Sequence, residues 1–319
     1  MRSKGDGHSE VTTQRTRIGA RGWLLYAAMA VLWGMPYLFI KQAVDSYSPA
    51  AVVAGRTLVG ALILLPFALR QRALRPAFGR IGWVLAFAAL EMAGPFILLS
   101  HAEQTLPSGL TGLLVATVPL FAALIAFGGG DRSVFRPSRA IGLGLGFVGV
   151  ALVVMGPGIA TGGDHLLAVV EVLLVAACYA VAPFIVARKL QGVPTLGSIT
   201  LSLLAVGIFY LPIALVTQRQ VPTLTSTLAL AALAVLCTAL AFVVFFALID
   251  QVGPTRAPLF TYVNPVVAII LGAIVLGEPL TVGLLVGFPL VVLGCWLAAT
   301  GGTLRTPRQR GGLPPVAPG

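Results

Sequence analysis

Apolar residues gather in ten long runs along the chain, and short groups of Pro, Gly and charged residues separate the runs. Each run has about 20 residues, the length that a helix needs to cross about 30 Å of hydrocarbon. Inside the runs apolar and polar residues do not alternate, as they would in the strands of a membrane barrel. The pattern predicts ten membrane-spanning helices, at about 22–43, 49–69, 81–101, 109–128, 139–158, 166–187, 197–217, 226–249, 257–277 and 280–300.

The ten runs form an internal repeat. Pro119 falls on Pro265 at a shift of 146 positions, and Pro36 falls on Pro183 at a shift of 147. A near-constant shift across distant positions indicates that a unit of five runs is present twice. Because five is odd, the second unit is inverted in the membrane if both units fold alike. Inverted repeats are typical of secondary transporters, whose substrate site lies near the bilayer midplane between the repeats.

The composition supports a membrane protein. Hydrophobic residues make up 58% of the 319 residues and charged residues only 10%, too few to cover a soluble surface. Soluble enzymes and nucleic-acid binders are therefore excluded, and no nucleic-acid partner is expected despite the formal net charge of +11. The three cysteines, Cys178, Cys237 and Cys295, lie inside apolar runs without metal-ligand spacing. They are expected to be small core residues, and no metal or cofactor is predicted.

The basic residues predict the orientation in the membrane. Eighteen of the 21 lie in the tails and in one alternating set of connections, whereas Arg219 lies alone in the other set. Basic residues accumulate on the cytoplasmic side, so we expect a multi-pass cell-membrane protein with both termini in the cytoplasm. The N-terminal tail, residues 1–21, has no apolar region of its own that could serve as a signal peptide. The tail at 301–319 is rich in Pro, Gly and Arg and is predicted to be disordered.

Several short motifs follow one another along the runs. They are Trp33-Gly34 followed by Lys41, then Pro49 and Arg56, Val118-Pro119, Asn264-Pro265 leading to Leu276-Gly277-Glu278, and finally Gly283, Gly287 and Gly294. These motifs resemble the EamA domain of the drug/metabolite transporter superfamily, present twice, at 22–158 and 166–300. The resemblance implies an all-α membrane protein of ten helices in two inverted five-helix repeats around a central cavity. It also implies export or exchange of small metabolites, often amino acids or drugs.

Glu91 is the most deeply placed ionisable residue. It lies at the centre of the run 81–101, about 15 Å from either end at about 1.5 Å per residue. A carboxylate at this depth faces a water-filled cavity, pairs with a cation or stays protonated, because an exposed charge in hydrocarbon is costly. Glu91 is therefore a candidate to bind a substrate amine, to carry a coupling proton, or to do both. The alternative is a structural hydrogen bond to a neighbouring helix.

Other ionisable residues lie nearer the ends of the runs. Arg56 is a candidate to bind a substrate carboxylate, but an interfacial anchor or an ion pair is the better interpretation at its depth. Lys41 is interpreted in the same way. His101 and Glu103 follow the third run, where a gate or proton path is conceivable but a solvated loop is favoured. Glu171 is expected to face the surface.

Two prolines predict helix breaks at matched positions, Pro119 and Pro265. Paired broken helices in corresponding places indicate a transporter binding site. Asn264, the only asparagine in the chain, and Tyr262 would supply hydrogen bonds near the second break. Three more aromatic residues are candidates to line the cavity, with packing or a membrane-interface belt as the alternative: Trp33, Tyr37 and Tyr179.

Small residues are spaced for close helix contact in the fifth and tenth runs, as Gly142-x3-Gly146 and Gly283-x3-Gly287. This spacing fits packing within the chain, or a homodimer face.

The sequence predicts a secondary transporter, not an enzyme, that exports small organic metabolites such as amino acids or drug-like compounds by alternating access. Its expected partners are a small-molecule substrate and the lipid bilayer, and coupling to protons is left open. The alternative is an importer or exchanger of sugars or nucleotide-linked sugars, which a more polar and basic cavity would favour. An intramembrane enzyme is a more distant alternative, because none of the three histidines lies in the middle of a run. The internal repeat disfavours a channel. Direct ATP coupling is not predicted, because the sequence contains no phosphate-binding loop motif.

Overall fold

A computed structural model describes residues 19–130, 136–155, 163–253 and 257–300 of the chain, apart from the side chains at 258 and 259. Most of the predicted tails, 1–18 and 301–319, lie outside the described residues. Every regular element in the described ranges is a helix. Nine of these helices, counted with their interruptions, are long and apolar enough to cross a membrane. The expected all-helical membrane fold is therefore confirmed.

The first half of the chain contains five of the nine candidate spans. They are α1 (Ala20–Leu32) with α2 (Pro36–Ala43), α3 (Pro49–Arg70), α5 (Ile81–Ala88) with η1 (Ala89–Ala93) and α6 (Gly94–Ala102), α7 (Ser108–Val115) with α8 (Val118–Gly128), and α9 (Pro137–Met155). A short helix, α4 (Leu74–Phe78), lies in the connection between α3 and α5.

The second half contains the other four and one shorter apolar helix. The four are α10 (Gly163–Lys189), α11 (Thr195–Thr217), α12 (Leu224–Ala234) with η3 (Val235–Leu240) and α13 (Ala241–Val252), and α15 (Val282–Thr300). The predicted run 257–277 appears instead as a 3-10 helix, η4 (Ala257–Tyr262), followed by α14 (Asn264–Val275). Its apolar helical part, Phe260–Val275, is shorter than a usual spanning helix.

Local signals in the sequence explain several helix boundaries. Pro36, Pro119 and Pro265 each stand in the first turn of a new helix, where the missing backbone donor costs nothing. These prolines divide α1 from α2, α7 from α8, and η4 from α14. Ser48 caps α3, because its Oγ accepts a hydrogen bond from the Ala51 amide at 3.3 Å. Gly253 ends α13 with a positive φ of 84°, a backbone conformation that glycine adopts more readily than other residues.

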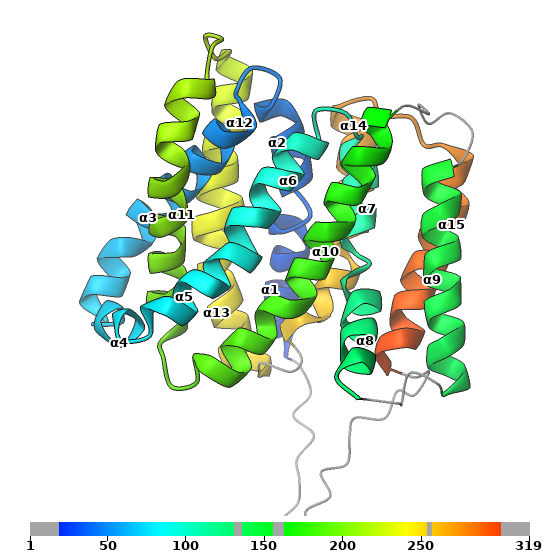
Figure 1. Ribbon diagram of the computed structural model, residues 1–319, viewed down its shortest axis with the longest axis horizontal. Coiled ribbons are helices and arrows are strands. Elements are labelled where there is room, and N and C mark those ends of the chain that lie inside the picture. Colours follow the sequence, from blue (N-terminus) through cyan, green and yellow to red (C-terminus); the bar gives the residue numbers. More distant parts are fainter. Residues whose placement is uncertain (1–18, 131–135, 156–162, 254–256, 301–319) are drawn as a thin grey trace, which may run out of the picture.

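Figure 1 shows the spans running up and down through one bundle. The described chain begins at α1 and ends at α15 on the same side, at the bottom of the figure, which we call the termini side. The other side, where α2, α6, α7 and α14 approach one another, is called the opposite side. The short helix α4 and the ends of α8 and α13 also lie on the termini side.

The bundle is held together by close helix pairs. Figure 1 shows α9 along α15 at one edge of the bundle, and α3 packs beside α11 near the other. The contact of α9 with α15 depends on glycine: a Cβ at Gly142 would lie 2.6 Å from the Ala298 amide nitrogen, and one at Gly149 would lie 2.9 Å from the Gly287 carbonyl oxygen. Gly142 and Gly149 therefore pack within the chain, against α15.

The outer surface of the bundle is apolar. Large side chains such as Leu62, Phe209 and Ile274 are 61%, 62% and 77% exposed. Such exposure on many helices would be unfavourable in water and is expected where a helix faces lipid.

Candidate functional site

A cavity of about 370 Å³ lies between the helices of the two halves. It is large enough for a small organic molecule. Its wall is mainly apolar and aromatic, and its two charged residues are Arg56 and Glu91. All nine residues that the sequence singled out as a site line this one cavity: Trp33, Tyr37, Arg56, Glu91, Pro119, Tyr179, Tyr262, Asn264 and Pro265.

Glu91 lies in an unusual turn of its helix. The segment η1 is a π-helix between α5 and α6, and Glu91 is its middle residue. A π-turn widens the helix by one residue per turn, and such turns are frequent at functional sites. The wider turn interrupts the α-helical register just where the carboxylate lines the cavity. Cys178 and Tyr179 of α10 lie within electrostatic range of Glu91.

The second half has a π-turn at the matching place. The π-helix η3 contains Cys237, which falls on Glu91 at the shift of 146 positions. Phe96 and Phe242 are related by the same shift, and both line the cavity. Neither π-turn was predicted from the sequence, and Phe96, Phe242 and Cys237 were not among the expected site residues. The constant shift, applied to Glu91, was the one signal that pointed to this second position.

Arg56 faces the interior and is only 5% exposed. Its guanidinium carbon lies 3.8 Å from the centroid of the Phe96 ring. Its Nη2 donates a long hydrogen bond to Thr238 Oγ1 at 3.4 Å, and its Nε has no partner among the described residues. The interpretation as an interfacial anchor is therefore wrong, because the side chain is buried inside the bundle against Phe96. A buried guanidinium with an unused donor can bind a carboxylate.

Aromatic side chains form much of the remaining wall. The Trp33 ring lies 5.8 Å from Phe242 and 5.1 Å from Phe245, measured between centroids, and it also contacts Phe260. Tyr37 is 8% exposed, so its hydroxyl is largely removed from solvent. Tyr179 lies within electrostatic range of both Glu91 and Arg56. The site thus contains a guanidinium group and a carboxyl group, both within electrostatic range of one aromatic hydroxyl.

Asn264 joins the two halves beside the cavity. When its amide is oriented to satisfy its neighbours, Nδ2 donates to the Phe260 carbonyl at 3.1 Å and to the Ala30 carbonyl at 3.3 Å. Ala30 belongs to α1, so this amide links the start of α14 to the first half. Asn264 therefore has a structural role in addition to lining the cavity.

Hydrogen bonds between the halves gather on the opposite side. Gln218, between α11 and α12, accepts from the Ser48 amide at 2.7 Å and donates to the Ser46 carbonyl at 2.8 Å. Ser226 donates to the Gln42 carbonyl at 2.7 Å. His101 Nδ1 lies 2.8 Å from Glu171 Oε2, and the Glu171 side chain is only 12% exposed, so the expectation that Glu171 faces the surface is wrong.

The strongest of these links involves Glu278, in the connection between α14 and α15. Its Oε1 accepts from the Ser108 amide at 2.6 Å. Its Oε2 accepts from Ser108 Oγ and from the Gly109 amide, both at 3.0 Å. A carboxylate of the second half thereby caps the N-terminus of α7 in the first half, where a negative charge is favoured.

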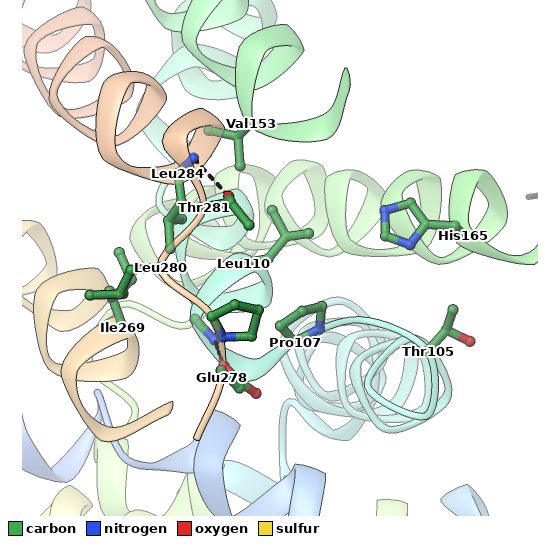
Figure 2. Close-up of a pocket in the computed structure, with 12 residues that line it drawn as sticks. Thr105, Pro107, Leu110, Val153, His165, Ile269, Glu278, Leu280, Thr281 and Leu284 are labelled. Atoms are coloured by element: carbon green, nitrogen blue, oxygen red, sulfur yellow. Dashed lines mark hydrogen bonds between the residues drawn. The ribbon is translucent and has the colours of Figure 1, made fainter. Parts of the chain in front are cut away.

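A smaller cavity of about 170 Å³ lies beside this cap. Its lining includes Glu278, Pro107 and His165, and Figure 2 shows Glu278 to the lower left of Pro107 and His165 apart from both at the right of the view. Thr281 caps the next helix, since its Oγ1 accepts from the Leu284 amide at 3.2 Å.

Glu103 differs most from its expectation. It directly follows α6 and is fully buried, so the favoured interpretation as part of a solvated loop is wrong. Lys41, which was interpreted as an anchor, donates from Nζ to the carbonyl oxygens of Glu103 and Leu106 at 2.6 and 3.1 Å. Burial of Glu103 comes from segments distant in the sequence, which a local pattern does not reveal.

Comparison with known proteins identifies relatives across almost the whole chain. The EamA-like transporter family matches twice, over residues 20–155 and 166–300. The uncharacterised inner membrane transporter YedA of Escherichia coli K12 is 27% identical over 258 residues, covering 80% of this chain and 82% of its own length. The uncharacterised transporter YvbV of Bacillus subtilis is 29% identical over 293 residues, covering 87% and 91%. A solved crystal structure with 20% identity shares the fold, with a TM-score of 0.61 over 87% of this chain and 96% of that one.

Proposed function

The chain belongs to the EamA-like transporter family, and from this premise we propose that it is a secondary transporter that exports small organic metabolites by alternating access. The proposed cargo is an amino acid or a drug-like compound, and the function involves no chemical reaction. The chain itself is a multi-pass membrane protein, in keeping with relatives that are named as transporters.

One observation carries the proposal: both halves contribute to a single cavity with a mainly apolar wall and two charged groups. Arg56 would bind a carboxylate of the cargo, and Glu91 would bind an amine or a coupling proton. The aromatic faces around Trp33 would hold an apolar part of the cargo or a cation. A sugar would need many more hydrogen-bonding groups than this wall offers, which favours export of less polar metabolites.

Alternating access is proposed to use two inverted repeats of five spans, with η4 and α14 as the tenth crossing. The start of α1 on the termini side and the start of α10 on the opposite side support this arrangement. The termini side is proposed to be cytoplasmic, because Arg70, Arg80 and Arg188 lie at helix ends there. The two tails, 1–21 and 301–319, would then be cytoplasmic.

The hydrogen bonds between the halves on the opposite side suggest that this arrangement is closed to the outside. Release of cargo outward would require the Gln218 and Glu278 contacts to separate. A ligand can shift such an equilibrium only by binding one arrangement more tightly than the other. Residues of the central cavity are therefore expected to change their mutual distances between the two arrangements.

The test is transport by the full-length protein in proteoliposomes, screened over metabolite classes with and without a pH gradient. We expect amino acids or drug-like compounds to be carried. Transport of sugars alone, or of nothing in the screen, would contradict the proposal.

The variant Glu91→Gln separates the roles proposed for Glu91, because it keeps the shape and removes the ionisable group. If Glu91 carries the proton, the variant loses transport driven by the pH gradient but still inserts and folds. Glu171→Gln is the matched control, since Glu171 does not line the central cavity. Unchanged pH-driven transport in Glu91→Gln would exclude the proton role.

A further inference from the structure

Glu103 has a buried carboxyl group with no hydrogen bond to offset its loss of hydration in the described part of the chain. The residue is 0% exposed, and neither side-chain oxygen has a hydrogen-bond partner in the described part of the chain. An ionised carboxylate in such a place would lose its hydration and gain no hydrogen bond in exchange. The group is therefore expected to be neutral, with a proton on one oxygen, in the arrangement observed.

Charged and titratable groups face Glu103 from three directions. Lys41 and Tyr37 come from α2, Arg56 comes from α3, and Glu278 comes from the connection before α15. Lys41 Nζ donates to the backbone carbonyl oxygens of Glu103 and Leu106 and not to the Glu103 carboxyl group. Glu278 has three donors on its carboxylate, so it carries the negative charge of this cluster.

These surroundings favour the neutral form of Glu103. Burial raises the pKa of Glu103 well above its usual range, and the nearby Glu278 charge raises it further. Lys41 and Arg56 oppose this shift but do not cancel it. A second negative charge near Glu278 is unfavourable, and the buried Glu103 has no hydrogen bond that would stabilise it.

We propose that Glu103 is a proton-binding site whose occupation closes the opposite side of the bundle. The inference rests on the proposed alternating access. When the side opens, water reaches the carboxyl group, the O–H bond breaks and the proton passes to water, leaving a hydrated carboxylate. Closure returns the side chain to its dry place and takes one proton back. Glu103 thus acts as a pH-dependent gate residue, separate from the cargo site.

The sign of the pH effect follows from linkage. In the open arrangement Glu103 would be hydrated, so its pKa would fall back toward the ordinary glutamate value. In the closed arrangement its pKa is raised. Below the ordinary value both arrangements are protonated and pH has no effect. Between the two pKa values, each rise of one pH unit shifts the equilibrium about tenfold toward the open arrangement, because opening releases one proton.

The experiment measures opening directly, without any cargo. Spin labels are attached to Gln104→Cys and Leu280→Cys, two exposed positions on different halves of the opposite side. The native cysteines are replaced by serine, and the full chain is reconstituted in liposomes. We expect the distance between the labels to shift to a longer population as pH rises. In Glu103→Gln the short distance should persist at every pH, because the amide mimics the neutral acid.

A second measurement follows the proton itself. The infrared band of a protonated carboxyl group should be present in the wild type at neutral pH and reduced in Glu103→Gln. Glu171→Gln is the matched control, since Glu171 is another glutamate on the opposite side and contacts His101 at 2.8 Å, and this variant should keep both the band and the pH dependence. Distances that do not respond to pH, an unchanged band in Glu103→Gln, or pH dependence lost only in Glu171→Gln would each overturn the proposal. Because neither readout involves transport, a failed transport screen would not affect them.

Discussion

Removal of the Glu278 carboxylate should destabilise the bundle by an amount that its contacts allow us to work out. The carboxylate accepts three hydrogen bonds, from two backbone amides and the Ser108 hydroxyl, at 2.6 to 3.0 Å. Hydrogen bonds to a charged group contribute about 1.5–3 kcal/mol each when buried. Glu278 is only half-buried, so water replaces part of each bond after the substitution. We therefore expect Glu278→Ala to lower the free energy of unfolding by about 2 kcal/mol, including about 0.5 kcal/mol from the helix dipole.

Two further variants separate the parts of this effect. Ser108→Ala removes only the hydroxyl donor and should cost about 1 kcal/mol. Gly272→Ala should also destabilise the cap, because a Cβ there would lie 2.7 Å from Ser108 Oγ and 3.1 Å from the Glu278 carboxylate carbon. Unfolding is followed in detergent by tryptophan fluorescence, and Glu278→Ala is combined with Ser108→Ala in a double-mutant cycle. Wild-type stability in Glu278→Ala, or strictly additive effects in the cycle, would refute the cap.

Three other predictions concern packing, the cavity and orientation. Gly287→Leu should lower the free energy of unfolding by about 2 kcal/mol through overpacking against α9, whereas Gly144→Leu, which has open space around it, should not; equal effects in thermal unfolding would contradict this. Asn264→Ala should weaken both cargo binding and stability by about 1–3 kcal/mol, because it removes the donor to Phe260 and Ala30; wild-type binding would remove Asn264 from the site. A cysteine at Val221, which is 91% exposed, should react with an impermeant probe in sealed cells, and protection there would reverse the proposed orientation.

Hydropathy predicted the fold class because the length and apolarity of a run are local properties. Nine runs appear as helices that could span a membrane, and the family resemblance is confirmed. The ninth run shows the limit of this signal. Its residues are apolar from 257 onward, yet the backbone forms a 3-10 turn before Asn264, because Pro265 cannot donate to the preceding turn. An apolar run therefore predicts that a segment lies within the membrane, but it does not predict that the segment is one continuous helix.

Contacts across the bundle could not be predicted in the same way. Distance from the end of a run placed Arg56 within reach of the interface, but only the packing of α3 brings it over Phe96. Glu103 follows a run and is bordered by polar residues, which resembles an exposed loop. It is buried because α2 and the Glu278 connection lie against it, and both are far away in the sequence. The position of a residue along a spanning run can be derived from the local sequence. The direction in which its side chain points depends on helices that are distant in the sequence.

The two halves share backbone features more than side chains. At matched positions both have a π-turn and both contribute a phenylalanine to the cavity, Phe96 and Phe242. The residue in the middle of the first turn is Glu91, and its counterpart in the second is Cys237. Arg56 likewise falls on Leu203 at the shift of 147 found upstream, and Leu203 is fully buried away from the cavity. Under the proposed alternating access, similar backbones would let the two halves exchange roles on the two sides of the membrane, whereas a cargo without two-fold symmetry would need charges on one half only. The duplication can thus serve the movement, and the divergence of side chains can serve recognition.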